Sequence, residues 1–120
     1  MLNHVVVMKF KPEVSAADVA ELEGMLDALP NRIMEIKMFE FGRDRLRSDR
    51  SHDFALVALF TNLAALERYR SHPEHRPVAE KIAAMCASVV TVDFDGADAG
   101  STEAGPPEWD RDPFERLKRL

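Results

Sequence analysis

The sequence predicts a single α+β domain in which two helices cover one face of a four-stranded antiparallel sheet. Four short segments are rich in β-branched and apolar residues, and two longer segments repeat apolar residues at helical spacing. These segments follow one another in the order βαββαβ. A chain of 120 residues has the size of one domain, and 46% hydrophobic with 31% charged residues is typical of a globular protein.

The first strand and the first helix are predicted at the start of the chain. Residues 4–10 read HVVVMKF and stop at Lys11-Pro12, which is the pattern of a strand and its end. Ser15 and Asp18 then have the spacing of a helix capping box. Apolar residues follow at helical spacing as far as Pro30, namely Val19, Leu22, Met25, Leu26 and Leu29.

The next two strands are predicted to form a hairpin. Residues 33–41 mix apolar and polar residues as a strand does, and residues 54–60 (FALVALF) form a strand that is apolar on both faces. The segment from Gly42 to Ser51 joins them and carries four arginines, interrupted by aspartates. We interpret it as a solvated loop with local ion pairs, and an anion site is the alternative.

A broken helix and a last strand complete the predicted domain. Asn62 is a suitable cap for a helix that runs through Tyr69, and Pro73 interrupts the pattern before it resumes from His75 to about Ala87. Residues 88–94 form the fourth strand. The resulting order, βαββαβ, is the split-βαβ or ferredoxin-like arrangement.

The predicted sheet has no polar face. Right-handed crossovers place both helices on one side of the sheet. Along the first strand, His4, Val6 and Met8 point one way while Val5 and Val7 point the other, so both faces are apolar. A face in contact with water would carry polar residues. We therefore expect a homodimer that pairs through this sheet face into a dimeric α/β barrel.

Residues 1–94 are predicted to form the domain, and residues 95–120 a linker with a short helical tail. Asp112 and Pro113 suit the start of a helix in which Phe114 and Leu117 share a face, with Trp109 just upstream. Two interpretations of this tail stay open: a loosely attached terminus, or an arm that covers its own pocket or a dimer neighbour.

Composition excludes several classes of function. A net charge of −5 argues against nucleic acid as a partner, because phosphate binding needs a clustered positive surface. The apolar stretch near the N-terminus is too short for a signal peptide or a membrane span, so we expect a cytoplasmic protein without a membrane partner. Cys86 is the only cysteine, which excludes an intrachain disulfide.

The segment from Tyr69 to His75 is the best candidate for chemistry. It places a phenol and two imidazoles, those of Tyr69, His72 and His75, around the helix break at Pro73. On an unbroken helix Tyr69 and His75 would point about 120° apart. A restart at Pro73 can aim His75 toward the groove between helices and sheet, where His4 also points.

A purely structural interpretation of this segment is also open, and composition alone favours it. In it, Ser71 caps the restarted helix, Glu74 completes a capping box, and the two histidines occupy polar positions at the domain surface. No metal site is predicted, because no further ligand follows His72 and His75 at a suitable spacing. No phosphate-binding loop is present either, and we expect no cofactor.

Three separated motifs resemble the stress-responsive A/B barrel domain family over about residues 3–94. They are HVVVMKFK at residues 4–11, FEFGR at residues 39–43, and Tyr69-x-x-His72-Pro73-x-His75. The resemblance implies a ferredoxin-like monomer that dimerises through its sheets. One plant member of the family is a polyketide cyclase that uses a histidine and a tyrosine, and the matching positions here are His75 and Tyr69.

By that resemblance, His75 would remove a proton activated by flanking carbonyl groups, and the phenol of Tyr69 would hydrogen-bond the developing enolate oxygen. His4 and His72 would line or orient the site. We expect an apolar cavity bounded by Val6, Met8, Leu22, Leu26 and Val78.

The leading hypothesis is therefore binding of a small hydrophobic carbonyl or acid compound between the helices and the sheet. One alternative is an acid-base enzyme of the cyclase or lyase type that uses His75 and Tyr69. The other is a non-enzymatic stress-stability protein without a ligand.

Overall fold

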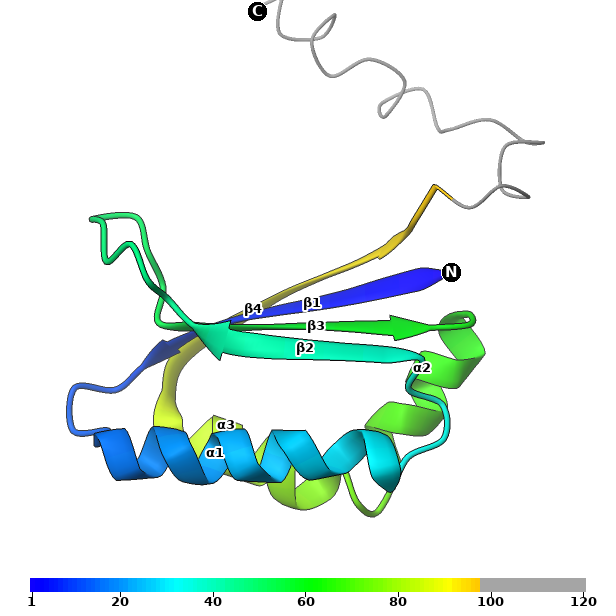
Figure 1. Ribbon diagram of the computed structural model, residues 1–120, viewed down its shortest axis with the longest axis horizontal. Helices are drawn as coiled ribbons and strands as arrows, with labels where there is room; N and C mark the ends of the chain where they lie inside the picture. The colour runs from blue at the N-terminus through cyan, green and yellow to red at the C-terminus, as the bar shows by residue number, and fades with distance from the viewer. Residues whose placement is uncertain (98–120) are drawn as a thin grey trace, which may run out of the picture.

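The computed structural model describes residues 1–97 and has the predicted βαββαβ order, with the second helical region divided in two (Figure 1). The expectations for the tail with Trp109 and Phe114 lie outside the described residues. The elements are β1 (Leu2–Phe10), α1 (Ala16–Ala28), the short 3₁₀ helix η1 (Leu29–Asn31), β2 (Met38–Arg43), β3 (Phe54–Phe60), α2 (Leu63–Arg70), α3 (Arg76–Met85) and β4 (Cys86–Asp95).

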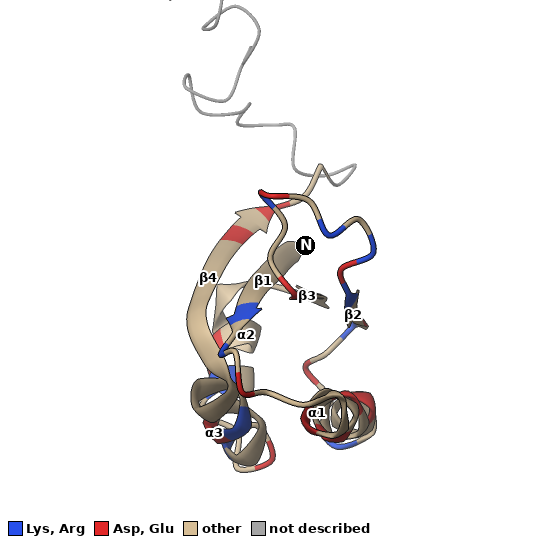
Figure 2. Cartoon of the chain, turned by 90° about the vertical axis from the view of Figure 1, so that its left-hand side faces the viewer, with Lys and Arg blue, Asp and Glu red and all other residues tan. Residues whose placement is uncertain are grey.

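The four strands form one antiparallel sheet in the order β2-β3-β1-β4. Helices α1 and α3 lie side by side beneath the same face of this sheet (Figures 1 and 2). The ferredoxin-like α+β arrangement predicted from the sequence is therefore confirmed. Within residues 1–97, no helix combines the length and the hydropathy needed to span a membrane.

Helix α1 begins at the predicted capping box. The Asp18 backbone N–H donates to Ser15 Oγ at 3.1 Å, and the Ser15 backbone N–H donates to Asp18 Oδ2 at 3.0 Å. The bond from the Ser15 backbone N–H to the carboxylate, and after it the Ser15 side chain, hold the pKa of the Asp18 carboxyl below its usual value. The helix buries Val19, Leu22 and Leu26 against the sheet.

The second strand lies further along the chain than predicted. The helical turn continues after η1, because Ile33 N–H donates to Leu29 O at 2.9 Å and Ile36 N–H donates to Ile33 O at 3.3 Å. Ile33 is thus a fully buried turn residue. Pairing with β3 starts at Lys37, whose N–H donates to Leu59 O at 2.8 Å. The prediction of a strand from residue 33 was therefore wrong.

The helix-facing side of the sheet forms the core. It contributes Leu2, Val6, Met8, Phe54, Leu56, Ala58 and Phe60, which pack against the buried residues of the helices.

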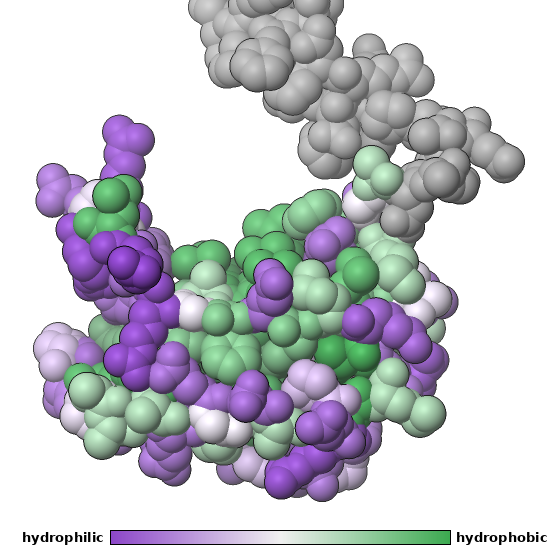
Figure 3. All heavy atoms as spheres, in the orientation of Figure 1, coloured by the Kyte–Doolittle hydropathy of each residue, from purple (hydrophilic) through white to green (hydrophobic). Residues whose placement is uncertain are grey.

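The opposite side of the sheet, here called the open face, is apolar and is not covered by any part of residues 1–97. The strand registers place these side chains on it: Val5, Val7, Ala55, Val57, Leu59, Val90, Val92 and Phe94. Val90, Val92 and Phe94 are about half exposed, at 52%, 61% and 47%. Figure 3 shows hydrophobic residues gathered on this upper surface of the molecule.

Candidate functional site

The break between α2 and α3 positions the candidate residues. Ser71 ends α2, since its hydroxyl donates to Glu67 O at 3.0 Å. His72 Nδ1 then accepts the backbone N–H of Glu74 at 3.0 Å and stabilises the turn. Helix α3 starts with His75 as its N-cap and without a side-chain cap. The predicted Ser71–Glu74 capping box was wrong, because Ser71 terminates the preceding helix.

A pocket of about 290 Å³, here called the α3 pocket, lies between α3 and the helix-facing side of the sheet. Its walls are apolar and consist of Val6, Leu26, Leu56, Val78, Ala79, Ile82, Ala83 and Val89. Its polar lining consists of His4, Tyr69, Arg70, His75 and Thr91. The lining residues come from six elements, β1, α1, β3, α2, α3 and β4, with His75 at the N-cap of α3.

Tyr69 lies at the centre of an aromatic cluster beside the α3 pocket. Its ring centroid is 4.5 Å from that of His75, 4.9 Å from that of Phe60 and 6.1 Å from that of His4. The side chain is 1% exposed, and this burial raises the pKa of the phenol to about 12. Tyr69 is therefore a protonated hydrogen-bond donor at neutral pH. Its hydroxyl makes no hydrogen bond within residues 1–97 and is available to a ligand.

His75 is held as a neutral base. Its Nδ1 lies 3.2 Å from the carbonyl oxygen of Arg70, and because a carbonyl can only accept, Nδ1 carries the proton and Nε2 the lone pair. Burial is the largest cause of a lowered pKa for this imidazole, and electrostatic interactions with His4, Arg70 and His72 act in the same direction. The hydrogen bond that Nδ1 donates to the Arg70 carbonyl raises the pKa and opposes them only in part.

His4 has a carboxylate partner that sequence reasoning did not identify. Its Nδ1 is 2.5 Å from Oδ1 of Asp93, which lies directly opposite His4 in the β1–β4 register. The two side chains are 12% and 34% exposed. A carboxylate that accepts from Nδ1–H fixes the ring orientation and leaves Nε2 as the second functional atom. Asp93 thus positions His4.

The structure does not place every expected residue in the α3 pocket. It brings together His4, Val6, Leu26, Tyr69, His75 and Val78. Met8 and Leu22 are fully buried in the core and do not line the pocket. His72 lines a separate depression of about 430 Å³ beside Arg68 and Met34. The side chain of His72 therefore shapes the helix break from outside the pocket.

The pocket combines one neutral imidazole, one protonated phenol and one carboxylate-bound imidazole with apolar walls. Such a set can hydrogen-bond a carbonyl or carboxyl oxygen and can move a proton, as general acid-base chemistry requires. Residues 1–97 contain no group of three or more His, Cys, Asp or Glu side chains suited to hold a metal ion.

Two solved structures with sequence similarity to this chain are described as dimeric ferredoxin-like proteins of unknown function. One, from Thermobifida fusca, is 30% identical with a TM-score of 0.74, and the match covers 79% of this chain and 90% of that chain. The other, from Bacteroides fragilis, is 25% identical with a TM-score of 0.71, covering 79% and 95%.

A hydroxynitrile lyase from Passiflora edulis shares the fold, with a TM-score of 0.73, 17% identity and coverage of 81% of this chain and 94% of that chain. No curated protein matches the chain. The sequence profile described as "Stress responsive A/B Barrel Domain" matches residues 2–95, which is most of the chain. The chain therefore belongs to the stress responsive A/B barrel domain family.

Proposed function

We propose that the protein binds a small, largely apolar carbonyl or carboxylic acid compound in the α3 pocket. The observation that carries this proposal is the placement of His4, Tyr69 and His75 in one pocket whose other walls are mainly aliphatic. The phenol and the imidazoles supply directional hydrogen bonds for one oxygen-bearing end of a ligand, and the walls take its hydrocarbon part. A volume of about 290 Å³ is at the lower end for small-molecule sites and favours a small compound.

A matched pair of variants on α3 tests this proposal. Ala79 lines the pocket, whereas Ala84 is also solvent-exposed on the same helix but lies outside the pocket. Small aldehydes, ketones and carboxylic acids serve as probes in ligand-observed NMR. We expect saturable binding to the wild type and to Ala84→Phe, and about tenfold or more weaker binding to Ala79→Phe, which is a loss of about 1.4 kcal/mol. Equal affinities for the two variants, or no saturable probe, would contradict the proposal.

Acid-base catalysis is a second candidate function. It is favoured by the free Nε2 of neutral His75 beside the protonated hydroxyl of Tyr69, and a lyase shares the fold. In this proposal, His75 Nε2 removes a proton from the carbon next to the carbonyl group. The Tyr69 hydroxyl donates a hydrogen bond to the oxygen on which negative charge develops.

Exchange of the α-protons of a bound carbonyl probe in D₂O separates catalysis from binding alone. If His75 is a base, the wild type accelerates the exchange, and His75→Gln lowers the rate by about 10² or more. Tyr69→Phe removes only the hydroxyl and should slow exchange more than it weakens binding. If the α-protons of the probe exchange no faster with saturating wild-type protein than in buffer alone, the catalytic proposal fails and only the binding function remains.

We also propose that the protein is a homodimer paired through the open face. The related structures from Thermobifida fusca and Bacteroides fragilis are described as dimeric, and the open face is apolar. Val92 is 61% exposed there, so Val92→Glu should leave the monomer folded and abolish pairing. Light scattering should give the mass of two chains for the wild type and for Ala84→Glu on α3, but the mass of one chain for Val92→Glu. A single-chain wild type at micromolar concentration would contradict this proposal.

A further inference from the structure

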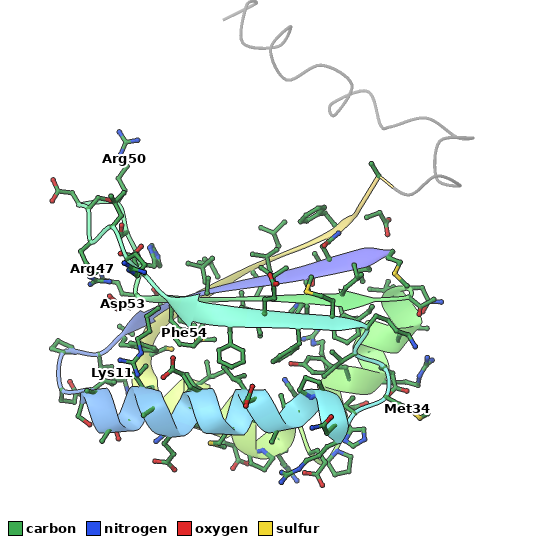
Figure 4. The ribbon with its side chains drawn as sticks, in the orientation of Figure 1. Lys11, Met34, Arg47, Arg50, Asp53 and Phe54 are labelled. Carbon is green, nitrogen blue, oxygen red and sulfur yellow. The ribbon has the colours of Figure 1, made fainter. Side chains whose placement is uncertain are left out.

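Residues 44–53, here called the arm, connect β2 and β3 and stand on the open-face side of the sheet. Figure 1 shows the arm rising away from the layer of helices, and Figure 4 shows Arg50 at its far end pointing away from the sheet. A second copy placed on the open face would meet the arm beside it. The arm therefore continues the surface that the proposed dimer buries.

The arm is braced from within. The Asp44 N–H donates to Asp53 O at 2.9 Å, and the Arg47 N–H donates to Asp44 Oδ2 at 2.6 Å. The Arg47 guanidinium donates to Asp53 Oδ1 at 2.8 Å and to the His52 carbonyl at 3.3 Å. Arg47 and Asp53 are labelled in Figure 4. These bonds hold Arg47 at a φ of 52°, in the left-handed region that non-glycine residues seldom adopt. The arm thus has a fixed shape before any partner binds.

This fixed shape holds unpartnered groups in solvent. Leu46 is 80% exposed, and Arg45 and Arg50 form no ion pair within residues 1–97. Glu40, on the open-face side of β2, also forms none within that part of the chain. A two-fold axis would place the open face of one copy, with Glu40 and the arm beside it, against the same surface of the other, because an isologous interface pairs a patch with its own counterpart.

A recess of about 180 Å³ lies at the foot of the arm, lined by Val7, Gly42, Phe54 and Ala55 together with the polar residues Arg43, Asp44 and His52. Val7, Ala55 and Gly42 are neighbours across β1, β3 and β2, since Gly42 pairs with Ala55 and Ala55 pairs with Val7. A Cβ at Gly42 would meet no atom within 4 Å. Two small residues side by side, Gly42 and Ala55, therefore leave an opening on the open face next to the polar residues at the foot of the arm.

We infer that the arm and this recess form a self-recognition site for a second copy of the chain. The recess takes an apolar side chain from the partner's open face, while the arm lies along the partner and packs Leu46 against it. This inference rests on the proposed open-face dimer and adds to it the elements that fix how the two copies fit together. A preordered arm loses little conformational freedom on pairing, which favours tight association.

Two glycine variants test the recess. Gly42→Leu fills the recess, whereas Gly24→Leu adds the same side chain at an exposed position of α1 where a Cβ also meets no atom within 4 Å. We expect Gly42→Leu to raise the dimer dissociation constant about tenfold or more, as measured by light scattering over a dilution series. Circular dichroism should show both variants folded, and Gly24→Leu should pair as the wild type does. An unchanged constant for Gly42→Leu would overturn the recess as a recognition site.

Two further variants test the arm. Leu46→Ser should weaken pairing, and Met34→Ser should not, because Met34 is 83% exposed at the helical side of the molecule (Figure 4). Amide hydrogen exchange of residues 44–53 should slow when the protein concentration is raised above the dissociation constant. Normal pairing of Leu46→Ser together with concentration-independent exchange in the arm would overturn its role.

The wild type and Val92→Glu separate failure of this inference from failure of the dimer proposal. If the wild type is monomeric, or if Val92→Glu leaves the dimer intact, the proposal of an open-face dimer fails and this inference fails with it. A dimer that Val92→Glu dissociates, but that Gly42→Leu and Leu46→Ser do not affect, overturns the self-recognition site alone.

Discussion

The ring centroids of Tyr69 and His75 lie 4.5 Å apart although Tyr69 belongs to α2 and His75 is the N-cap of α3. On one continuous helix their side chains would point about 120° apart. The contact exists because Ser71 closes α2 and the turn around His72 redirects the chain before α3 begins. The helix break is thus what joins a phenol and an imidazole into one site.

His72 supports this break from outside the pocket, and its substitution should act on His75 indirectly. His72→Ala removes the acceptor of the Glu74 N–H and should lower the free energy of unfolding by about 1 kcal/mol. Probe affinity should fall as well, because the orientation of His75 is less well fixed. His72→Asn offers a short-side-chain acceptor and should restore both values. Urea unfolding and NMR titration measure the two effects, and equal behaviour of the Ala and Asn variants would argue against this role.

The stability of the protein should depend on pH through His75. Burial lowers the pKa of His75 in the folded state below its ordinary value of 6.5, so the unfolded chain binds the proton first as pH falls. The contribution of His75 is therefore fully present above about pH 6.5 and is lost progressively below it. His75→Gln should lack this component.

Urea unfolding of the wild type and of His75→Gln between pH 8 and pH 5 measures this contribution, because groups common to both proteins cancel in the difference. The difference in free energy of unfolding should fall as the pH is lowered. A constant difference, or one that rises on acidification, would show that His75 is not held in a site that disfavours its charge.

Tyr69 can be titrated without interference, since it is the only tyrosine in the chain. Absorbance at about 295 nm follows tyrosinate formation, and the folded protein should titrate well above 10, toward the pKa of about 12 that burial produces. The effect of Tyr69 on the free energy of unfolding has the opposite pH dependence to that of His75. The unfolded chain loses its proton near pH 10, so the contribution of Tyr69 is lost as pH rises from about 10 toward 12. A reversible midpoint near 10 in folded protein would contradict the buried position.

Ile33 and Met34 are neighbours in sequence with opposite environments, at 0% and 83% exposure. Ile33→Ala should lower the free energy of unfolding by about 2–5 kcal/mol, because it leaves a cavity beneath the turn after η1. Met34→Ala should change it by less than about 0.5 kcal/mol. Urea denaturation of both variants tests the turn directly. A strand through residue 33 would not require this difference, and similar values would contradict the observed turn.

The sequence predicted most of the fold because its local signals agree with the tertiary contacts. The alternation in β1 and β3 and the capping box at Ser15 and Asp18 all correspond to observed elements. The second strand was predicted to begin too early, because Ile33 and Ile36 suit either a strand or a buried turn. Only the backbone hydrogen bonds to Leu29 and Ile33 decide between the two.

The candidate site was less accessible to sequence reasoning. Helical spacing and strand alternation show which residues face inward, but they do not separate pocket walls from the core, so Met8 and Leu22 were grouped with Val6 and Leu26. Asp93 was missed because its contact with His4 depends on the register between β1 and β4. The alternation of side chains along β4, combined with that register, places Asp93 on the same face of the sheet as His4 and would have identified the contact.

The most direct test of the proposed function is an NMR titration of methyl-labelled protein with a small carbonyl or acid probe that saturates it. The account predicts that the perturbed methyl groups cluster on the walls of the α3 pocket, at Val6, Leu56, Val78 and Ile82, and that the His75 imidazole signal shifts with them. Saturable shifts confined to the depression beside His72, or to residues 44–53, would contradict it.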